Sequence, residues 1–196
     1  MTSKKFFSML AVACMLMVAE PAHAQFFKKL GKELKNIGKE ILETVQTNAE
    51  NGVVTTADGI TIVSGHPDLK IEVQRCVASG SNLFLDLVMT NTNSNDVSEF
   101  RVHGCYYGDE TKVYDDRGNI YEDDIYVKVA NKEYTGGDYR FKLVSGLPTA
   151  VSILVKGFST KATSLALVEP FFEARDMGIE ATTIKLRNIP ITRAEE

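Results

Sequence analysis

Seven acidic side chains lie close together in the middle of the chain and are the residues best suited to bind a metal ion. They are Asp109, Glu110, Asp115, Asp116, Glu122, Asp123 and Asp124. Carboxylate oxygens are the hard ligands that Ca²⁺ prefers, and adjacent hairpin loops could bring several of them together. We therefore predict a calcium site formed by Asp115, Asp116, Asp123 and Asp124. Because tight turns also require Asp, Gly and Asn, the segment 116–119 has a purely structural interpretation as well.

The same acidic cluster has an enzymatic interpretation, because two carboxyl groups on either side of a glycosidic bond can hydrolyse it. The sequence does not set the distance between these carboxylates, and the chain has no Trp on which a sugar could stack. Gly-x-Ser-x-Gly, Ser-x-x-Lys, His-Glu-x-x-His and phosphate-binding glycine motifs are all absent from the sequence. A carboxylate-dependent hydrolase is therefore a second alternative for the function, and no cofactor is predicted.

Cys76 and Cys105 are the second group of residues with useful chemistry. In an exported protein an even number of cysteines is expected to pair, so we predict a disulfide between them. Closing a loop of about 30 residues would stabilise the fold by roughly 3 to 4 kcal/mol. The alternation of apolar residues before each cysteine places both on polar strand faces unless a bulge intervenes, which makes the bond peripheral. The alternatives are two free thiols, or a zinc site completed by His103.

The N-terminus has the pattern of a cleaved secretory signal peptide. Lys4 and Lys5 precede an apolar run from residue 6 to residue 19, and Ala22-His-Ala24 supplies a small-residue cleavage site. The run is shorter than the roughly 20 residues that a membrane-spanning helix needs. We predict that residues 1–24 are removed after Ala24 and that the protein is exported, to the periplasm or out of the cell. A retained anchor and lipid attachment at Cys14 are the alternatives.

Residues 25–47 are predicted to form an amphipathic helix. The apolar residues of this segment follow the three-and-four spacing of a helix, and lysines occupy much of the remaining surface. The apolar face consists of Phe27, Leu30, Leu34, Ile37 and Ile41. Three surfaces could accept it: the protein's own β domain, a second copy of the helix, or a lipid interface with anionic head groups. The segment also resembles cathelicidin-type host-defence helices, although three glutamates keep its positive charge low.

Residues 48–58 are predicted to form a polar linker that could contain a short strand at Val53-Val54. Beyond this linker, the apolar residues follow a period of two. Short segments rich in β-branched and aromatic residues recur along the chain and are separated by turn residues; they begin at positions 60, 69, 83, 99, 112, 125, 139, 151, 164 and 183. Strands at this spacing without helices between them predict an antiparallel sandwich over residues 59–190, followed by a tail at 191–196. We expect Leu85 and Ile153 to face the core, and one helical turn within residues 171–178.

Three turn motifs resemble those of immunoglobulin-like sandwich modules in bacterial exported proteins. They are a strand ending in Thr-Asn at residues 83–91, an Asp-x-x-Gly-Asn-x-Tyr hairpin at 115–121, and a Leu-x-x-Gly-x-Pro turn at 143–148. The resemblance covers residues 68–168. It implies an immunoglobulin-like fold and supplies no catalytic residues. The predicted fold is therefore all-β, an antiparallel immunoglobulin-like β-sandwich preceded by a short amphipathic α-helix.

The distribution of charged residues along the chain excludes one class of function. The whole chain has a formal net charge of −4. Removal of the signal peptide leaves −5, which divides into +1 for residues 25–50 and −6 for the remainder. An acidic domain does not fit a nucleic-acid binder. We predict an exported, non-enzymatic binding or structural module of the cell envelope, whose partner is a protein or a glycan. The alternative is a membrane-associating protein whose residues 26–45 contact lipid or a second copy.

Overall fold

The computed structural model describes residues 46–48, 52–105, 110–181 and 183–194. All of these residues belong to one compact unit, Thr44–Glu196. The predicted signal peptide and nearly all of the predicted helix at 25–47, including its five apolar-face residues, lie outside the described residues. The exception is β1 (Gln46–Asn48), a strand that takes the last two positions assigned to that helix. None of the helical structure in the described part is long and apolar enough to cross a membrane.

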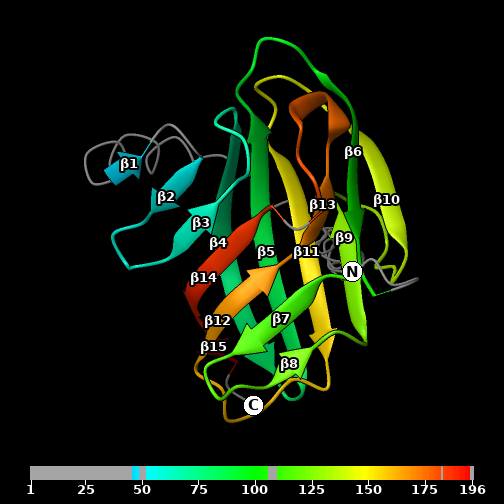
Figure 1. Cartoon of the computed structure of the whole chain (residues 1–196). Helices are drawn as coiled ribbons and strands as arrows, with labels where there is room; N and C mark the ends of the chain where they lie inside the picture. The colour runs from blue at the N-terminus through cyan, green and yellow to red at the C-terminus, as the bar shows by residue number, and fades with distance from the viewer. Residues whose placement is uncertain (1–45, 49–51, 106–109, 182, 195–196) are drawn as a thin grey trace, which may run out of the picture. The chain divides into compact units, whose positions relative to one another are not determined.

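The described residues form mainly β-strands, which are arranged in three sheets (Figure 1). Sheet A has the order β1, β2 (Val53–Thr55), β3 (Thr61–Val63), β14 (Lys185–Pro190), β12 (Ser164–Glu169), β7 (Lys112–Asp115) and β8 (Ile120–Tyr121). Sheet B has the order β15 (Thr192–Arg193), β4 (Leu69–Ser79), β5 (Asn82–Asn91), β11 (Thr149–Lys156) and β9 (Ile125–Val129). Sheet C has the order β10 (Asp138–Leu143), β6 (Val97–His103) and β13 (Phe171–Glu173). Neighbouring strands are antiparallel except β15 and β4, which confirms the predicted class.

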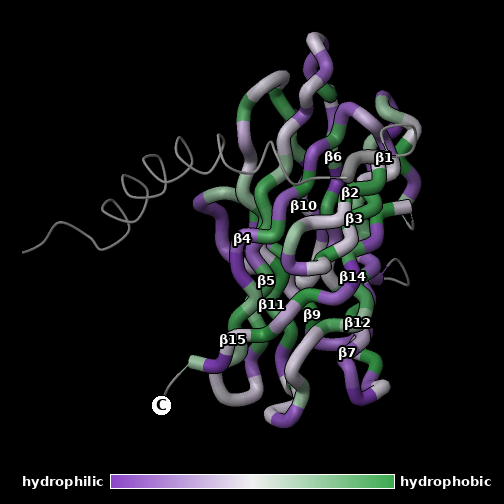
Figure 2. The backbone as a smooth tube through the Cα atoms, turned by 90° about the vertical axis from the view of Figure 1, so that its left-hand side faces the viewer, coloured by the Kyte–Doolittle hydropathy of each residue, from purple (hydrophilic) through white to green (hydrophobic). Residues whose placement is uncertain are grey.

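The alternation of apolar residues explains where the central strands lie. In β5 and β11 alternate side chains are buried, and the antiparallel register places Leu85 opposite Ile153 and Leu87 opposite Val151. Side chains that lie directly opposite share one face of a sheet, so these four residues form one apolar surface. They pack in a single core that also includes Leu165 of sheet A. Figure 1 shows β12 and β14 in front of β4 and β5, and Figure 2 shows apolar and polar residues alternating along the strands.

A β-bulge in β4 moves Cys76 from the predicted polar face into the core. The register between β4 and β5 shifts between Val73 and Arg75, so the side chains beyond this point change faces. Cys76 is consequently buried and lies opposite Leu85. The predicted polar position of Cys76 is wrong because the strict alternation ends at the bulge.

Short segments outside the main predicted strands also join the sheets. β2 lies within the predicted linker at 48–58 and includes the short strand considered there at Val53-Val54, and β15 lies within the predicted tail, where Thr192 is opposite Val77. β13 occupies the start of the segment 171–178, and the helical turn predicted there is the 3-10 turn η2 (Arg175–Met177). β13 and β15 were not predicted as strands, because segments of two or three residues have little sequence pattern and neighbouring strands determine their conformation.

Candidate functional site

Asp115 is buried at the end of β7, with only 2% of its surface exposed. Its Oδ1 accepts the backbone N–H groups of Arg117 and Asn119, both at 2.9 Å. Its Oδ2 accepts the Asn119 amide at 2.7 Å and the Tyr121 hydroxyl at 3.0 Å. Burial raises the pKa of Asp115, but these hydrogen bonds outweigh burial, so the pKa lies below its ordinary value. The Asp115 carboxylate therefore stabilises the turn between β7 and β8 through these hydrogen bonds.

The other three aspartates predicted to bind calcium do not join Asp115. Asp116 accepts the Thr163 hydroxyl at 2.5 Å and the Thr163 N–H at 3.1 Å, and these bonds hold its pKa below the usual value. Asp123 and Asp124 are exposed. Within the described residues, no group of three or more His, Cys, Asp or Glu side chains could hold a metal ion. The calcium prediction is therefore corrected, because Asp115 and Asp116 each serve a separate turn.

Cys76 and Cys105 are both free cysteines in the structure, in place of the predicted disulfide. Cys76 lies in β4 of sheet B, whereas Cys105 follows β6 of sheet C and is only partly buried against the core. Burial, and to a smaller extent the nearby Asp86 carboxylate, raises the pKa of the Cys76 thiol to about 12. A thiol that stays protonated at neutral pH is a poor nucleophile.

Alkylation of the folded protein is expected to distinguish the two thiols. Cys105 should react with iodoacetamide because it is partly exposed, whereas Cys76 should react only after denaturation. Mass spectrometry of the alkylated chain of residues 25–196, which lacks Cys14, then gives one adduct in the folded state and two in the unfolded state. If neither thiol reacts after denaturation without a reductant, the disulfide is present and the free-thiol assignment is wrong.

Both described histidines occupy structural positions. The Nδ1 atom of His66 accepts the N–H of Asp68 at 3.1 Å, which fixes the turn before β4. His103 is buried beside the ring of Phe171, and its Nδ1 atom has no hydrogen-bond partner in the described part of the chain. The predicted zinc alternative required His103 together with Cys76 and Cys105, and the described residues do not bring these three into one group.

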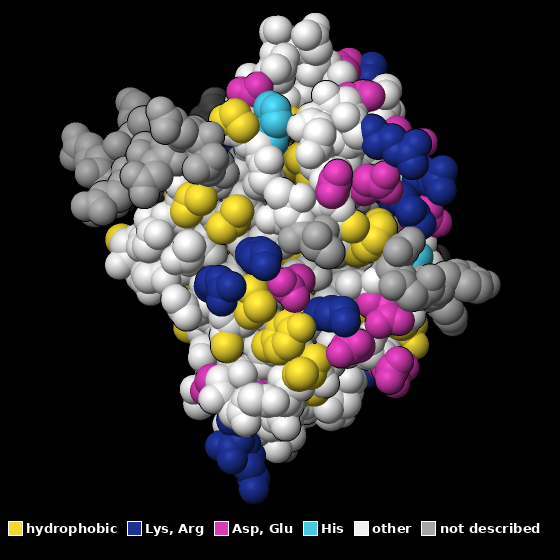
Figure 3. Space-filling model, viewed as in Figure 1, with side chains coloured by type: hydrophobic (Ala, Val, Ile, Leu, Met, Phe, Trp, Pro, Cys, Tyr) yellow, Lys and Arg dark blue, Asp and Glu magenta, His cyan; other side chains and the backbone are white. Residues whose placement is uncertain are grey.

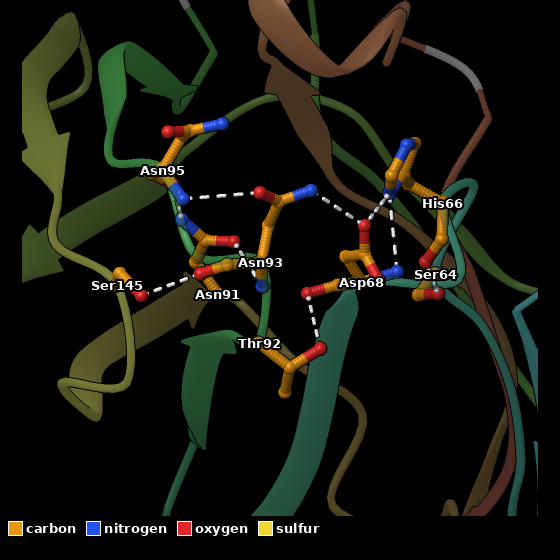
Figure 4. Close-up of polar contacts among 8 residues, drawn as sticks. All are labelled: Ser64, His66, Asp68, Asn91, Thr92, Asn93, Asn95 and Ser145. Atoms are coloured by element: carbon orange, nitrogen blue, oxygen red, sulfur yellow. Dashed lines mark hydrogen bonds and ion pairs between the residues drawn. The ribbon is translucent and has the colours of Figure 1, made fainter.

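Three loops are joined by hydrogen bonds at one end of the strands, and we call residues 64–68, 91–96 and 144–148 the loop end (Figure 4). The amide of Asn93 donates to Asp68 Oδ2 at 2.8 Å, and the Thr92 hydroxyl donates to the Asp68 carbonyl at 3.1 Å. On the other side, the Ser145 hydroxyl donates to the Asn93 carbonyl. The central loop is therefore tied to both of its neighbours.

Asparagines at every second position build the central loop. Asn91 Oδ1 accepts the N–H of Asn93, and Asn93 Oδ1 accepts the N–H of Asn95, each at 3.0 Å. These are successive Asx turns. The amide of Asn91 donates to the Asn95 carbonyl at 2.8 Å and to the Leu143 carbonyl at 3.5 Å, and Asn91 is completely buried. This loop was not predicted, although the Asn-x-Asn-x-Asn spacing in the sequence is the signal that indicates it.

The segment 144–148, between β10 and β11, is held against the central loop by its backbone. The N–H of Ser145 donates to Asp96 Oδ1 at 2.8 Å, and the N–H of Gly146 donates to the Asn91 carbonyl at 2.7 Å. The N–H of Leu147 closes a turn on the Val144 carbonyl at 3.1 Å. These bonds fix the conformation of the segment at both its start and its centre.

This fixed segment presents two apolar side chains to solvent. Leu147 is 56% exposed and Val144 is 37% exposed, and no residue of the segment 144–148 is charged. Among the large apolar side chains that the structure describes, only Ile120 of β8 is similarly exposed. Apolar groups held in solvent by a well-ordered loop are typical of contact surfaces.

The outer face of sheet C is a second surface, and it is dominated by charge. Arg101 Nε lies 3.0 Å from Asp138 Oδ2 and its Nη1 lies 3.5 Å from Glu173 Oε2. Hydrogen bonds from Arg140 and then Arg101 hold the pKa of Asp138 below its usual value. Figure 3 shows charges of both signs where β6 and β10 lie in Figure 1. A shallow pocket of about 100 Å³ beside Arg101 and Arg175 is lined only by charged residues, so its charges pair with one another.

Neither a family model nor a curated protein sequence matches this chain. The functional proposal therefore rests on the geometry of the loop end and on the sequence.

Proposed function

We propose that this protein is an exported, non-enzymatic binding module of the cell envelope, an immunoglobulin-like β-sandwich that contacts a protein or glycan through its loop end. The signal-peptide pattern of residues 1–24 supports export. The antiparallel sheets around one core are compatible with the immunoglobulin-like fold that the turn motifs imply. In this proposal the amphipathic segment 25–47 serves docking or assembly.

The observation that carries the proposal is the fixed segment that holds Val144 and Leu147 in solvent. Apolar surface gains about 25 cal/mol per Å² when a partner covers it. The hydrogen bonds of Ser145 and Gly146 hold the segment in one conformation, so less conformational entropy is lost on binding. Exposed Asp96, which accepts the Ser145 N–H and pairs with Lys142, lies beside it and supplies a polar edge, as in the rim of a protein interface.

The acidic turn supports the non-enzymatic part of the proposal. The carboxylates of Asp115 and Asp116 are engaged by donors that hold the chain in turns. The lowered pKa values of both groups follow from those hydrogen bonds. Their perturbed titration therefore has a structural cause and does not indicate acid–base chemistry.

Site-specific photo-cross-linking in the producing cell tests the loop end as a contact surface. A photoreactive amino acid replaces Leu147, and in the matched control it replaces Ile120 of β8, which is 55% exposed. We expect a discrete covalent adduct from position 147 and none from position 120, because both sites offer equal access and only the former lies on the loop end. Mass spectrometry of the adduct identifies the partner. Equal labelling from both positions, or no adduct from position 147, contradicts the proposal.

A further inference from the structure

Each of the three sheets ends in two edge strands, and in the described part of the chain one of these edge strands is long and has no strand paired on its outer side. The edge strands β1, β8, β13 and β15 have only two or three residues each. β9 is longer, but Thr135 covers it, because Val127 N–H donates to the Thr135 carbonyl at 2.8 Å and Thr135 N–H donates back at 2.9 Å. β10 has six residues and pairs with β6 alone. An unpaired edge of this length is a template for another strand.

The side chains of β10 alternate between charged and aromatic. Asp138, Arg140 and Lys142 are exposed, whereas Tyr139 and Phe141 are half-buried against the core. The strand lies at the border of the molecule in Figure 1. Because opposite signs of charge stand at the two ends of its outer face, β10 is complementary to a second β10 that runs in the opposite direction.

We propose that two copies of this protein associate by antiparallel pairing of their β10 strands around a twofold axis at Arg140. In this register, Asp138 of each copy lies opposite Lys142 of the second copy. On the other face, Tyr139 of each copy lies opposite Phe141 of the second copy. Twofold symmetry makes both kinds of pair occur twice, and the two sheets C become one continuous sheet.

Cross-strand pairs select this register over its neighbours. Opposite charges and aromatic pairs directly across an antiparallel ladder are stabilising, whereas like charges are destabilising. A shift of the axis to Phe141 places Arg140 opposite Lys142, which are both positive. A shift of the axis to Tyr139 keeps Asp138 opposite Arg140, but it places Phe141 opposite Gly137 and leaves one aromatic pair, Tyr139 with Tyr139, in place of two. Of these three registers, the axis at Arg140 is the one that forms two pairs of opposite charge and two aromatic pairs.

The axis itself brings two Arg140 side chains together, and their charges are already balanced within each copy. Arg140 Nε lies 2.9 Å from Asp138 Oδ2, and its Nη1 lies 3.8 Å from Glu99 Oε1. Each guanidinium is therefore held towards its own acidic neighbours. Opposite charges within each copy reduce the repulsion between the two arginines.

Disulfide trapping tests the axis directly. Opposed residues in antiparallel strands have Cα atoms about 4.5 to 5.5 Å apart, which is within the range that a disulfide spans. Arg140→Cys is therefore expected to give a covalent dimer on mild oxidation. Lys142→Cys is the matched control, because in this register the two positions 142 lie about 13 Å apart along the strands. Both variants carry Cys105→Ser, so that the partly exposed native thiol does not react.

Sedimentation of the unmodified chain, residues 25–196, gives the second measurement, and we expect the mass of a dimer. Lys142→Glu faces Asp138 of the second copy with a like charge and is expected to weaken association about tenfold. Lys161→Glu changes the same charge at an exposed position away from β10 and should leave association unchanged. A monomer at every concentration, or a dimer that neither Lys142→Glu weakens nor Arg140→Cys traps, overturns the pairing. If the protein is a monomer, any strand that pairs with β10 must belong to a different protein.

Discussion

Asn91→Asp is expected to lower the free energy of unfolding by about 4 kcal/mol at neutral pH, because it places an uncompensated charge in a buried site. The Asn91 amide donates to the carbonyls of Asn95 and Leu143, and the residue is completely buried. The introduced carboxylate has the shape of the amide, but its second oxygen replaces the Nδ2 donor. That oxygen therefore faces the carbonyl oxygens of Asn95 and Leu143 without a hydrogen bond. Urea unfolding followed by circular dichroism measures the loss, and reduced cross-linking from position 147 measures the disorder of the loop end.

The pH dependence of Asn91→Asp separates the charge from a packing defect. Protonation removes the charge, so the deficit relative to the unmodified protein should shrink as the pH falls. Asn95→Asp is the control, because Asn95 is exposed and its side chain makes no hydrogen bond within the described residues. Its effect should stay within about 0.5 kcal/mol. A deficit of equal size at all pH values would show that the buried amide is not the donor that the structure places there.

Asp115→Asn is expected to destabilise the protein by about 3 kcal/mol at neutral pH. The substitution replaces one carboxylate oxygen, which accepts hydrogen bonds, with an NH₂ group, which donates them and so faces other donors in a buried site. The unmodified carboxylate accepts two backbone N–H groups, the Asn119 amide and the Tyr121 hydroxyl. Unfolding in urea at several pH values measures the difference. The local consequence is loss of the turn that pairs β8 with β7, which hydrogen exchange of the Asn119 amide reports.

The sign of the pH effect at Asp115 follows from its lowered pKa. The carboxylate contributes stability above its ordinary pKa of 3.8, and that contribution is lost as the pH falls through the lower value of the folded state. The difference between the unmodified protein and Asp115→Asn should therefore shrink in acid, because the unmodified protein loses stability. Asp123→Asn, in the same acidic cluster but exposed, is the control and should change little. An equal effect of both substitutions would contradict a special role for Asp115.

The strand pattern was predictable because it is local. In β5 and β11 the alternation of apolar residues places Leu85 and Ile153 in the core, and the structure confirms both. The period of two is a property of the extended backbone, so a few residues are enough to recognise it. The turn between β7 and β8 was recognisable for a similar reason, since Asp, Gly and Asn act within four residues of one another.

The position of Cys76 and the calcium prediction failed because both depend on distant partners. The bulge between Val73 and Arg75 is defined by the register with β5, and no feature of β4 alone locates it. The acidic cluster looked like a shared metal site, but Asp116 instead bonds Thr163, which is 47 positions away in the chain. Proximity in sequence therefore did not decide which groups the carboxylates meet.

The sequence by itself determined the class of the fold, the positions of the main strands along the chain and the local turns, because side-chain alternation and turn chemistry act over a few residues. Only the tertiary structure decided which loops meet and which strand edge stays open. The buried Asn91 depends on the carbonyl of Leu143, which is 52 residues away. In the described part of the chain β10 pairs with β6 alone, whereas Thr135 bonds to Val127 at the edge of β9. Such long-range contacts form only when distant segments satisfy one another's hydrogen bonds and pack in one core, so they cannot be predicted from any single segment.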